Sequence, residues 1–482
     1  MQLVLLKLRI LMTLCLSLLL SETTYAKPPK QVDVVIIGAG LSGMATAYGL
    51  KKAGISYHLL ELSPRVGGRV RTVRYERPGE PAIYADSGME EYWESNPAVK
   101  ILEELKLPTR SDVAVSSLVL GSRLYELGDE TGAEFYQRIF TKEELAAIQN
   151  FKTLVAPLIE EIKSGKVLKP ELMALKDNSF EDYVKKSKVP AKVADWIRVS
   201  IECEIGTSWS RISALDGLAE FHIFTGNKGI GEKSYRVRGG NDKFTDGMAK
   251  HIGFSNISLN KRVNRVVTVG NKVQVTYLDT STNTNGVITA KHVVSTIPLF
   301  RLSELQFEPA LSEKKRQAIQ SQMWGSYFKA HLFVAPAAEK FWIKKKASIL
   351  PILSDSDMGV IYDGNPDQKG KTRIVSILVT GDAAEAFNMM PLDQVRTNIT
   401  QGFEKLWPGF GKEIKGIEFY RYHPRAIAAW PVGRSRYDEL SNEIRKPEHR
   451  VYLAGDFTES SHSDGAFLSA ARVVKQIQAN NK

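Results

Sequence analysis

The sequence predicts an α/β fold, α+β overall, with one discontinuous sheet domain and a second domain that combines a mixed sheet with helices. Three observations predict it. A strand–helix–strand pattern runs from Val32 to Glu61, apolar residues recur at helical spacing between residues 140 and 225, and short alternating strands follow residue 257. The 482 residues are 43% hydrophobic and 25% charged, an ordinary globular composition that is long enough for two domains.

The first element is a glycine-rich turn between a strand and a helix. An apolar strand, residues 32–37, enters a GxGxxG motif, a helix is expected over residues 44–53, and a second strand ends at Glu61. Gly38 permits the tight turn, Gly40 lets the backbone approach a pyrophosphate, and Gly43 allows close helix–strand packing. The helix N-terminus offers N–H groups to phosphates, and Glu61 can accept hydrogen bonds from an adenosine ribose. This is a Rossmann-like unit for a dinucleotide.

The residues after Glu61 distinguish between dinucleotides. Arg65 is followed by Gly67, Gly68 and Arg69, and paired glycines with a cation suit a second pass by a pyrophosphate or a flavin. A nicotinamide cofactor does not need such a tail. At this point the chain resembles the FAD-dependent amine oxidase superfamily, which is related to protoporphyrinogen oxidases and carotenoid desaturases. The resemblance implies FAD as cofactor, with Arg65, Gly68 and Arg69 among its binding residues.

The C-terminal region indicates FAD independently. A strand-like run, residues 450–454, leads into Gly455 and Asp456, and Gly465 and Ala466 open a helical segment that extends to residue 477. Such a corner binds anions. In the family it faces the ribityl–pyrophosphate, and the helix N-terminus points at the flavin ring, where its dipole stabilises negative charge. The loop before Gly465 is short for an amine oxidase, and Ala470 stands where many relatives have glycine.

The middle of the chain supplies the remaining elements. Helices are expected over residues 96–106 and 243–252, and apolar residues such as Leu145, Leu154 and Leu158 suggest a helical portion of a substrate domain. Strands are expected over residues 257–260, 263–269, 272–278, 286–289 and 293–297. In the family the chain returns here to the FAD domain, and the backbone near Val263 contacts the adenine side.

The resemblance therefore divides the chain into discontinuous domains. Residues 1–26 are expected to be a signal peptide. The FAD-binding domain is expected to comprise residues 30–95, 232–305 and 420–482, and the substrate domain residues 96–231 and 306–419.

The candidate catalytic residue is Lys329. Alternation places Tyr327, Lys329, His331 and Phe333 on one face of a strand. The pattern is similar to monoamine and polyamine oxidases, in which the corresponding lysine holds a water near flavin N5 and assists reoxidation by O₂. A cation near a reduced, anionic flavin is also favourable electrostatically.

The candidate substrate pocket comprises Glu90, Glu91, Tyr327 and Trp430. Acidic residues near Glu90 and Glu91 could attract a cationic amine, or they could belong to an acidic surface loop. Trp430 could be an aromatic wall or a core residue. Arg425 and Ala426 stand where some relatives have a flavin-linked cysteine and a wall tyrosine, which predicts a non-covalent FAD.

Other reactive groups are sparse. His331, His423 and His462 are isolated, and satisfied polar roles are expected for them. Only Cys15 and Cys203 are present, and Cys15 lies in the expected signal peptide, so no disulfide and no cysteine-based metal site are expected in the mature chain. No metal ligand set is assigned.

The N-terminus predicts export. Lys7 and Arg9 precede an apolar run, residues 10–20, that is too short for a membrane span, and a small-residue cleavage site ends at Ala26. An uncleaved anchor is the alternative. We expect a periplasmic or secreted protein without a stable membrane span. The net charge of +11 is spread along the chain, so nucleic acid is not an expected partner, and a homodimer stays open.

The leading hypothesis is an exported, FAD-dependent amine oxidase. The resemblance implies hydride transfer from an amine to flavin N5, an imine product, and H₂O₂ after reoxidation by O₂. One alternative is a desaturase or porphyrinogen-type oxidase of a bulky apolar substrate, suggested by residues 425–433. Another is an FAD-binding protein without turnover.

Overall fold

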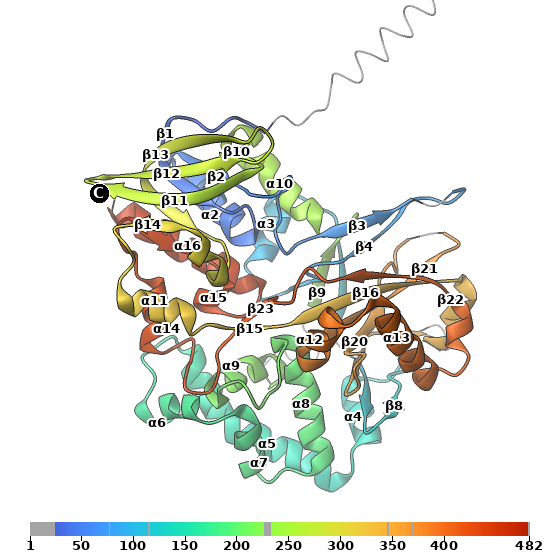
Figure 1. The fold of residues 1–482 in the computed structure, drawn as a ribbon. Helices are drawn as coiled ribbons and strands as arrows, with labels where there is room; N and C mark the ends of the chain where they lie inside the picture. Colours follow the sequence, from blue (N-terminus) through green and yellow to red (C-terminus); the bar gives the residue numbers. More distant parts are fainter. Residues whose placement is uncertain are drawn as a thin grey trace, which may run out of the picture.

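The computed structural model describes residues 25–76, 78–113, 116–225, 233–344, 347–368 and 370–480. Nearly all of the expected signal peptide, residues 1–24, lies outside the described residues. The described chain folds into an eight-stranded sheet with helices, a seven-stranded sheet, and a helical region below both in the view of Figure 1.

The eight-stranded sheet is built from three distant stretches of chain. Its order is β10–β2–β1–β13–β12–β11–β14, and β24 also pairs with β13. The strands are β1 (Gln31–Ile37), β2 (Tyr57–Leu60), β10 (Ile257–Ser258), β11 (Lys261–Val269), β12 (Lys272–Asp279), β13 (Thr284–Ser295), β14 (Gln306–Glu308) and β24 (Val451–Leu453). Strand β1 runs parallel to β2 and β13, as a Rossmann-like unit requires.

Strand β1 is buried on both faces. Val34 and Ile36 pack in a cluster with residues of the helices, whereas Val35 and Ile37 pack against β11 and β12. A strand covered on both sides needs apolar residues in succession, which explains the unbroken VVII run. The covering helices are α2 (Leu41–Lys52), α3 (Ala98–Glu104), α10 (Asp242–Ile252) and α16 (Ser463–Asn480).

Several expected boundaries were wrong, including the start of the first helix, which was expected at residue 44 but lies at Leu41. Residues 286–289 and 293–297 were expected as separate strands, but β13 is continuous because Ala290 and His292 pair with β1 after the preceding residues have paired with β12. The C-terminal helix begins at Ser463, two residues before Gly465, and the expected polar loop contains a short helix, α15 (Asp456–Glu459).

The first and the last long helices of the described chain pack side by side. Helices α2 and α16, blue and red in Figure 1, pack against each other. A Cβ atom added at Gly49 of α2 would lie 2.9 Å from a methyl carbon of Val474 in α16. Such close packing joins the N-terminal strand–helix–strand unit to the C-terminal corner.

The seven-stranded sheet carries Lys329. Its order is β22–β16–β21–β20–β19–β7–β8. The strands are β7 (Ser117–Leu120), β8 (Arg123–Tyr125), β16 (Tyr327–Val334), β19 (Ile352–Ser354), β20 (Val360–Asp363), β21 (Arg373–Thr380) and β22 (Ile414–Tyr420). On β16 the side chains of Phe328, Ala330 and Leu332 pack in the same cluster as residues of α12 (Gly381–Met389) and α13 (Leu392–Leu406).

The opposite face of β16 meets a hairpin. His331 contacts Tyr75 of β3 (Thr72–Tyr75), and Phe333 packs with Ile83 and Ala85 of β4 (Ile83–Asp86). The expected alternation along residues 327–333 is therefore confirmed. The remaining short strands and helices outside the helical region are β5 (Tyr92–Trp93), β6 (Thr109–Val113), β9 (Lys233–Val237), β15 (Met323–Gly325), β17 (Ile343–Lys344), β18 (Ala347–Ser348), β23 (Ile427–Ala429), α11 (Glu313–Gln320) and α14 (Glu439–Arg445).

The helical region consists of residues 132–225. Its helices are α4 (Gly132–Ile139), α5 (Lys142–Lys163), α6 (Pro170–Met173), α7 (Phe180–Lys186), α8 (Ala191–Ile205) and α9 (Ala214–Thr225). On α5 the buried stripe is Phe151, Val155 and Ile159, whereas Leu154 is exposed. The apolar spacing predicted a helix correctly but included one residue of its outer face. Short 3₁₀ helices lie at Ala174–Asp177, Phe254–Asn256, Leu299–Glu304, Pro336–Phe341 and Phe410–Glu413.

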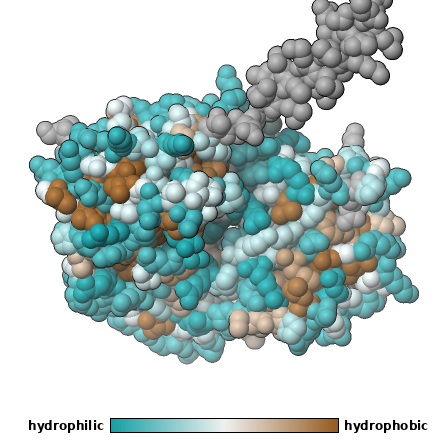
Figure 2. All heavy atoms as spheres, turned by 45° about the horizontal axis from the view of Figure 1, so that its top comes forward, coloured by the Kyte–Doolittle hydropathy of each residue, from teal (hydrophilic) through white to brown (hydrophobic). Residues whose placement is uncertain are grey.

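The surface is mostly polar on the side drawn in Figure 2. Hydrophilic residues cover most of that face, and the apolar residues form small, separate patches. Among the described residues, no helix has both the length and the apolar character that a membrane span requires.

Candidate active site

The glycine loop after β1 has the geometry that its motif predicts. Gly38 has φ of +101°, which favours glycine, and a Cβ atom on Gly43 would lie 1.9 Å from the carbonyl oxygen of Gly38. Gly40 caps α2 in an extended conformation without a side-chain hydrogen bond. The first N–H groups of this twelve-residue helix are thus left to an external acceptor such as a phosphate.

The second glycine pair lies directly against this loop. Gly67 donates a 2.8 Å hydrogen bond to the Ala39 carbonyl, and a Cβ atom on Gly68 would lie 3.1 Å from the Cα atom of Gly40. Arg65 donates hydrogen bonds to the carbonyls of residues 66, 68 and 70. Arg65 therefore shapes the second loop, and only small residues fit where the two loops meet.

Glu61 stands at the end of β2 beside both loops. Its carboxylate accepts hydrogen bonds from the backbone N–H groups of Ala39, at 2.7 Å, and Ser63, at 2.9 Å. The acid expected to bind a ribose thus lies within hydrogen-bond reach of the glycine turn. Val263 is a buried residue of β11, next to an irregularity in its pairing with β12.

The C-terminal corner is joined to the second loop by an ion pair. Arg69 donates two parallel hydrogen bonds, at 2.6 and 2.7 Å, to the carboxylate oxygens of Asp456. The Asp456 side chain is almost completely buried. Gly455 donates to the Ser469 hydroxyl of α16, and a Cβ atom on Gly465 would lie 2.3 Å from the Ser460 carbonyl oxygen. Ala466 and Ala470 are buried in α16.

Lys329 is held inside the protein by one segment of chain. Its side chain is 3% exposed, and its ammonium group donates to the carbonyls of Asp86, at 3.2 Å, and Gly88, at 2.5 Å, and to the Glu90 carboxylate. A lysine has three N–H donors, so these contacts use all of them. A water bound to Lys329 would have to replace one of these acceptors.

Glu90 is the counter-ion of Lys329. Its carboxylate also accepts a 2.6 Å hydrogen bond from Tyr362 and lies 3.8 Å from Arg236. Despite burial, Lys329 and Arg236 keep the pKa of Glu90 below its usual value. Glu91 lies 3.8 Å from the same Arg236. The two predicted pocket carboxylates thus share a partly exposed arginine.

Tyr327 connects β16 to helix α8. Its hydroxyl donates a 2.6 Å hydrogen bond to the backbone carbonyl of Glu204, and burial raises its pKa well above the usual value. The Glu204 carboxylate lies 3.9 Å from Nε2 of His462, the residue that precedes α16. Burial and the carboxylates of Glu91 and Glu220 raise the pKa of Glu204 to about 6.

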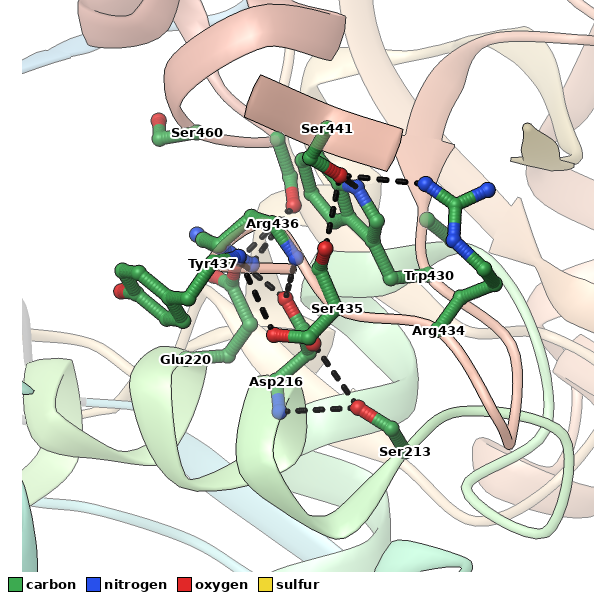
Figure 3. A network of polar contacts seen from close by, with 12 residues as sticks. Ser213, Asp216, Glu220, Trp430, Arg434, Ser435, Arg436, Tyr437, Ser441 and Ser460 are labelled. Carbon is green, nitrogen blue, oxygen red and sulfur yellow. Dashed lines mark hydrogen bonds and ion pairs between the residues drawn. The ribbon is translucent and has the colours of Figure 1, made fainter. Parts of the chain in front are cut away.

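A buried polar network positions His462. His462 pairs with Glu220 at 2.9 Å, Glu220 pairs with Arg436, and Arg436 also pairs with Asp216 at 2.8 Å. Figure 3 shows Asp216 and Glu220 projecting from one helix, α9, toward Arg436. Burial lowers the pKa of His462, but the charge and the hydrogen bond of Glu220 raise it by more, so the pKa of His462 rises to about 9.

Trp430 does not line an accessible site. It is 1% exposed, donates a hydrogen bond to Ser441, and lies under the Arg436 guanidinium at 4.5 Å (Figure 3). Trp430 was predicted as a pocket wall with core packing as the alternative, and its position in the core beneath β11 and β12 favours the alternative. His331 bonds to Tyr75, and its pKa is lowered to about 3 by burial.

The sequence analysis missed Glu204, Glu220, Arg236 and Tyr362, and it treated His462 as isolated. One signal was available for Glu204. Ile197, Ser200 and Ile201 are buried on α8, and Glu204 follows at helical spacing on this apolar face. The His462 network brings together residues more than 200 positions apart, so no local pattern indicates it. Within the described ranges, no group of three or more metal-ligating side chains is arranged to hold an ion.

The comparisons with known proteins agree with this geometry. The model of the flavin-containing amine oxidoreductase family matches residues 41–478, and the chain belongs to that family. It is an FAD-dependent oxidoreductase of the amine oxidase type, which acts on CH–NH₂ donors.

The chain is similar to curated proteins along nearly its whole length. It is 24% identical to a probable flavin-containing monoamine oxidase A of Dictyostelium discoideum, over 92% of this chain and 97% of the relative. It is also 24% identical to an L-amino-acid oxidase of Bothrops moojeni, over 94% and 90% of the two chains.

Solved structures share the fold. Putrescine oxidase bound to putrescine superposes with a TM-score of 0.79 at 20% identity and covers 94% of this chain and 100% of its own. Cyclohexylamine oxidase from Brevibacterium oxydans superposes with a TM-score of 0.76 at 19% identity, with the same coverage of both chains. At these identities the likeness shows the fold alone.

The residues present fit FAD. The uncapped N-terminus of α2 and the Gly40–Gly68 approach suit a pyrophosphate, and Glu61 is placed for the ribose. The α16 N-terminus and its preceding His462 add positive charge at the other corner.

Replacing Gly43 by alanine is expected to remove FAD from an otherwise folded chain. The new Cβ atom would displace the Gly38 carbonyl and distort the phosphate loop. Bound flavin per chain, measured by absorbance, should fall about tenfold or more, the equivalent of at least ~1.4 kcal/mol of binding free energy. Gly128→Ala is the control, because a Cβ atom there meets no heavy atom within 4 Å. A wild-type flavin content in Gly43→Ala would contradict the expectation.

His462 is expected to make stability pH-dependent. Its folded pKa of about 9 lies above the ordinary value of 6.5, so its contribution is complete below pH 6.5 and is lost as pH rises through 9. The free energy of unfolding of the FAD-loaded protein should fall over this window by up to about 3 kcal/mol. His462→Gln should flatten the fall, and His449→Gln, on the surface, should not. Equal slopes in all three proteins would contradict this role.

Proposed function

We propose that the chain is an exported oxidase of an amine that holds FAD non-covalently. Bound FAD supplies the hydride acceptor at N5, and O₂ returns it to the oxidised form with formation of H₂O₂, while the amine becomes an imine. The observation that carries the proposal is the burial of Lys329, which residues 86–90 hold in place. Lys329 lies on β16, the strand that the family resemblance places beside the flavin.

The contribution of the protein is positioning and electrostatics. The start of β16 is fastened to the end of α8 by the Tyr327 hydroxyl and by a 2.7 Å hydrogen bond from Ser326 to the Gly206 carbonyl. The strand that carries Lys329 is thereby fixed to α8, and the Lys329 side chain is fixed to residues 86–90. Fixed charges in a desolvated site stabilise developing charge without reorganising.

Non-covalent binding is supported by the cysteine content. Cys203 would be the only cysteine after signal cleavage, and its thiol is buried in α8, where burial raises its pKa. Arg425 occupies the place of the cysteine that some relatives link to the flavin. Heat or acid denaturation should therefore release FAD into the supernatant.

Export is supported by the sequence of residues 1–26. Cleavage after Ala26 would remove three contacts: the hydrogen bond from the Ala26 N–H to the Ile257 carbonyl, the hydrogen bond from the Ser258 hydroxyl to the Ala26 carbonyl, and the packing of Tyr25 on Phe254. The mass of the secreted or periplasmic protein tests this part of the proposal, since a chain that begins at Lys27 is expected.

The central test is anaerobic flavin bleaching. The mature protein is purified with its FAD, and monoamines, diamines and amino acids are added without oxygen. At least one amine should bleach the flavin absorbance, and admission of O₂ should restore it with stoichiometric H₂O₂. Bleaching by a polyene or a porphyrinogen but by no amine would favour the alternative reaction.

Removal of Lys329 is expected to slow reoxidation. Because Lys329→Met alone leaves the Glu90 carboxylate without its main counter-ion, Lys329→Met with Glu90→Gln is the cleaner variant. Stopped-flow reoxidation of its reduced FAD by O₂ should slow about tenfold or more, or ~1.4 kcal/mol. The matched control is Lys340→Met with Glu413→Gln, an ion pair outside the site. Unchanged reoxidation in the first variant would eliminate the role of Lys329.

A further inference from the structure

Glu204 differs from the other carboxylates around it. It lies in the last turn of α8, and 28% of its side chain is exposed. Among the described residues, none donates a hydrogen bond to its carboxylate, and the nearest cationic atom is His462 Nε2 at 3.9 Å. A partly buried carboxylate without a close partner is costly unless a ligand supplies one.

The location of Glu204 ties it to the proposed reaction site. Its backbone carbonyl accepts the Tyr327 hydroxyl, and Lys329 follows two residues later on β16, about 7 Å along the strand. On its other side lies His462, next to the N-terminus of α16. Glu204 thus stands between the strand that carries Lys329 and the helix expected to face the flavin.

The neighbouring carboxylates already have cations. The pairs are Glu220 with His462 at 2.9 Å, Asp216 with Arg436 at 2.8 Å, Glu90 with Lys329, and Glu91 with Arg236 at 3.8 Å. Each of these four cations is therefore engaged by another carboxylate. Glu204 is the acid of this group without a close cation, so these five carboxylates and four cations carry one excess negative charge when all of them are ionised.

That excess charge selects the class of substrate. A cation can neutralise it, whereas the carboxylate of an amino acid would add to it. The reacting nitrogen of an amine must be neutral, because its lone pair stabilises the carbon from which hydride leaves. The cation that Glu204 accepts is therefore a second nitrogen, which stays protonated while the first reacts.

We propose that Glu204 is a specificity-determining residue that pairs with the non-reacting ammonium group of a diamine. The inference rests on the proposed amine oxidase function and names its substrate class. The preference should appear as a lower KM for a diamine than for a monoamine of the same chain length, with a smaller effect on kcat, because the pair forms in the ground state as well as in the transition state.

The kinetic test compares 1,4-diaminobutane with butylamine on the FAD-loaded mature protein. Glu204→Gln should lower kcat/KM for the diamine about tenfold or more and change that for butylamine by less than about threefold. Glu204→Asp, which keeps the charge, should retain part of the preference. Asp195→Asn, on the same helix but outside the site, is the matched control. Equal losses for both amines, or no diamine preference in the wild type, would overturn the inference.

A binding test separates the inference from the reaction. A diamine whose α-carbons carry no hydrogen, 2,5-diamino-2,5-dimethylhexane, cannot lose hydride, and 2-amino-2-methylpentane is its monoamine counterpart. By calorimetry, Glu204→Gln should weaken the diamine about tenfold or more and leave the monoamine unchanged, with FAD content and circular dichroism as in the wild type. Equal diamine affinity in Glu204→Gln and wild type would overturn the role of Glu204. Diamine binding that depends on Glu204, without bleaching by any amine, would support that role and overturn the proposed reaction instead.

Discussion

The Arg69–Asp456 ion pair is the interaction on which the cofactor site depends. It joins two loops that are 387 residues apart in sequence, each at the carboxyl end of its own strand–turn unit. Bidentate geometry fixes direction as well as distance, and the nearly complete burial of Asp456 makes an unpaired state costly. The pair joins the paired-glycine loop, which packs against Gly40, to the corner before α16, so the two segments expected to hold FAD are fixed by the same contact.

Buried charges then organise the part of the site where chemistry is expected. Lys329 and Glu90 neutralise each other, and Arg436 holds two carboxylates of α9, one of which orients His462. Such groups carry a desolvation cost that only complete pairing offsets. Glu204 differs from the carboxylates of these pairs because its nearest cationic atom lies 3.9 Å away, which leaves it available to a substrate cation.

Local patterns predicted the fold well where the chemistry is local. The turn at Gly38 needs a positive φ, and β1 needs unbroken apolar residues, so both can be recognised in the sequence. Alternation on β16 correctly placed Lys329 with His331 and Phe333. The sequence left the role of Trp430 open because an aromatic residue after a strand suits a core as well as a pocket, and only the packing around it favours one of the two. Glu204 was missed because its importance lies in lacking a partner, which no sequence pattern reports.

The sequence by itself determined the Rossmann-like unit, the FAD site and the family, because these depend on residue types at fixed short spacings. The tertiary structure alone decided which charges neutralise one another. Glu90 pairs with Lys329, Glu220 pairs with His462, and Glu204 has no close cation. Electrostatic energy depends on distances in space and on burial, and the partners of these two pairs lie 239 and 242 residues apart in the chain. The candidate substrate class therefore emerges only after folding.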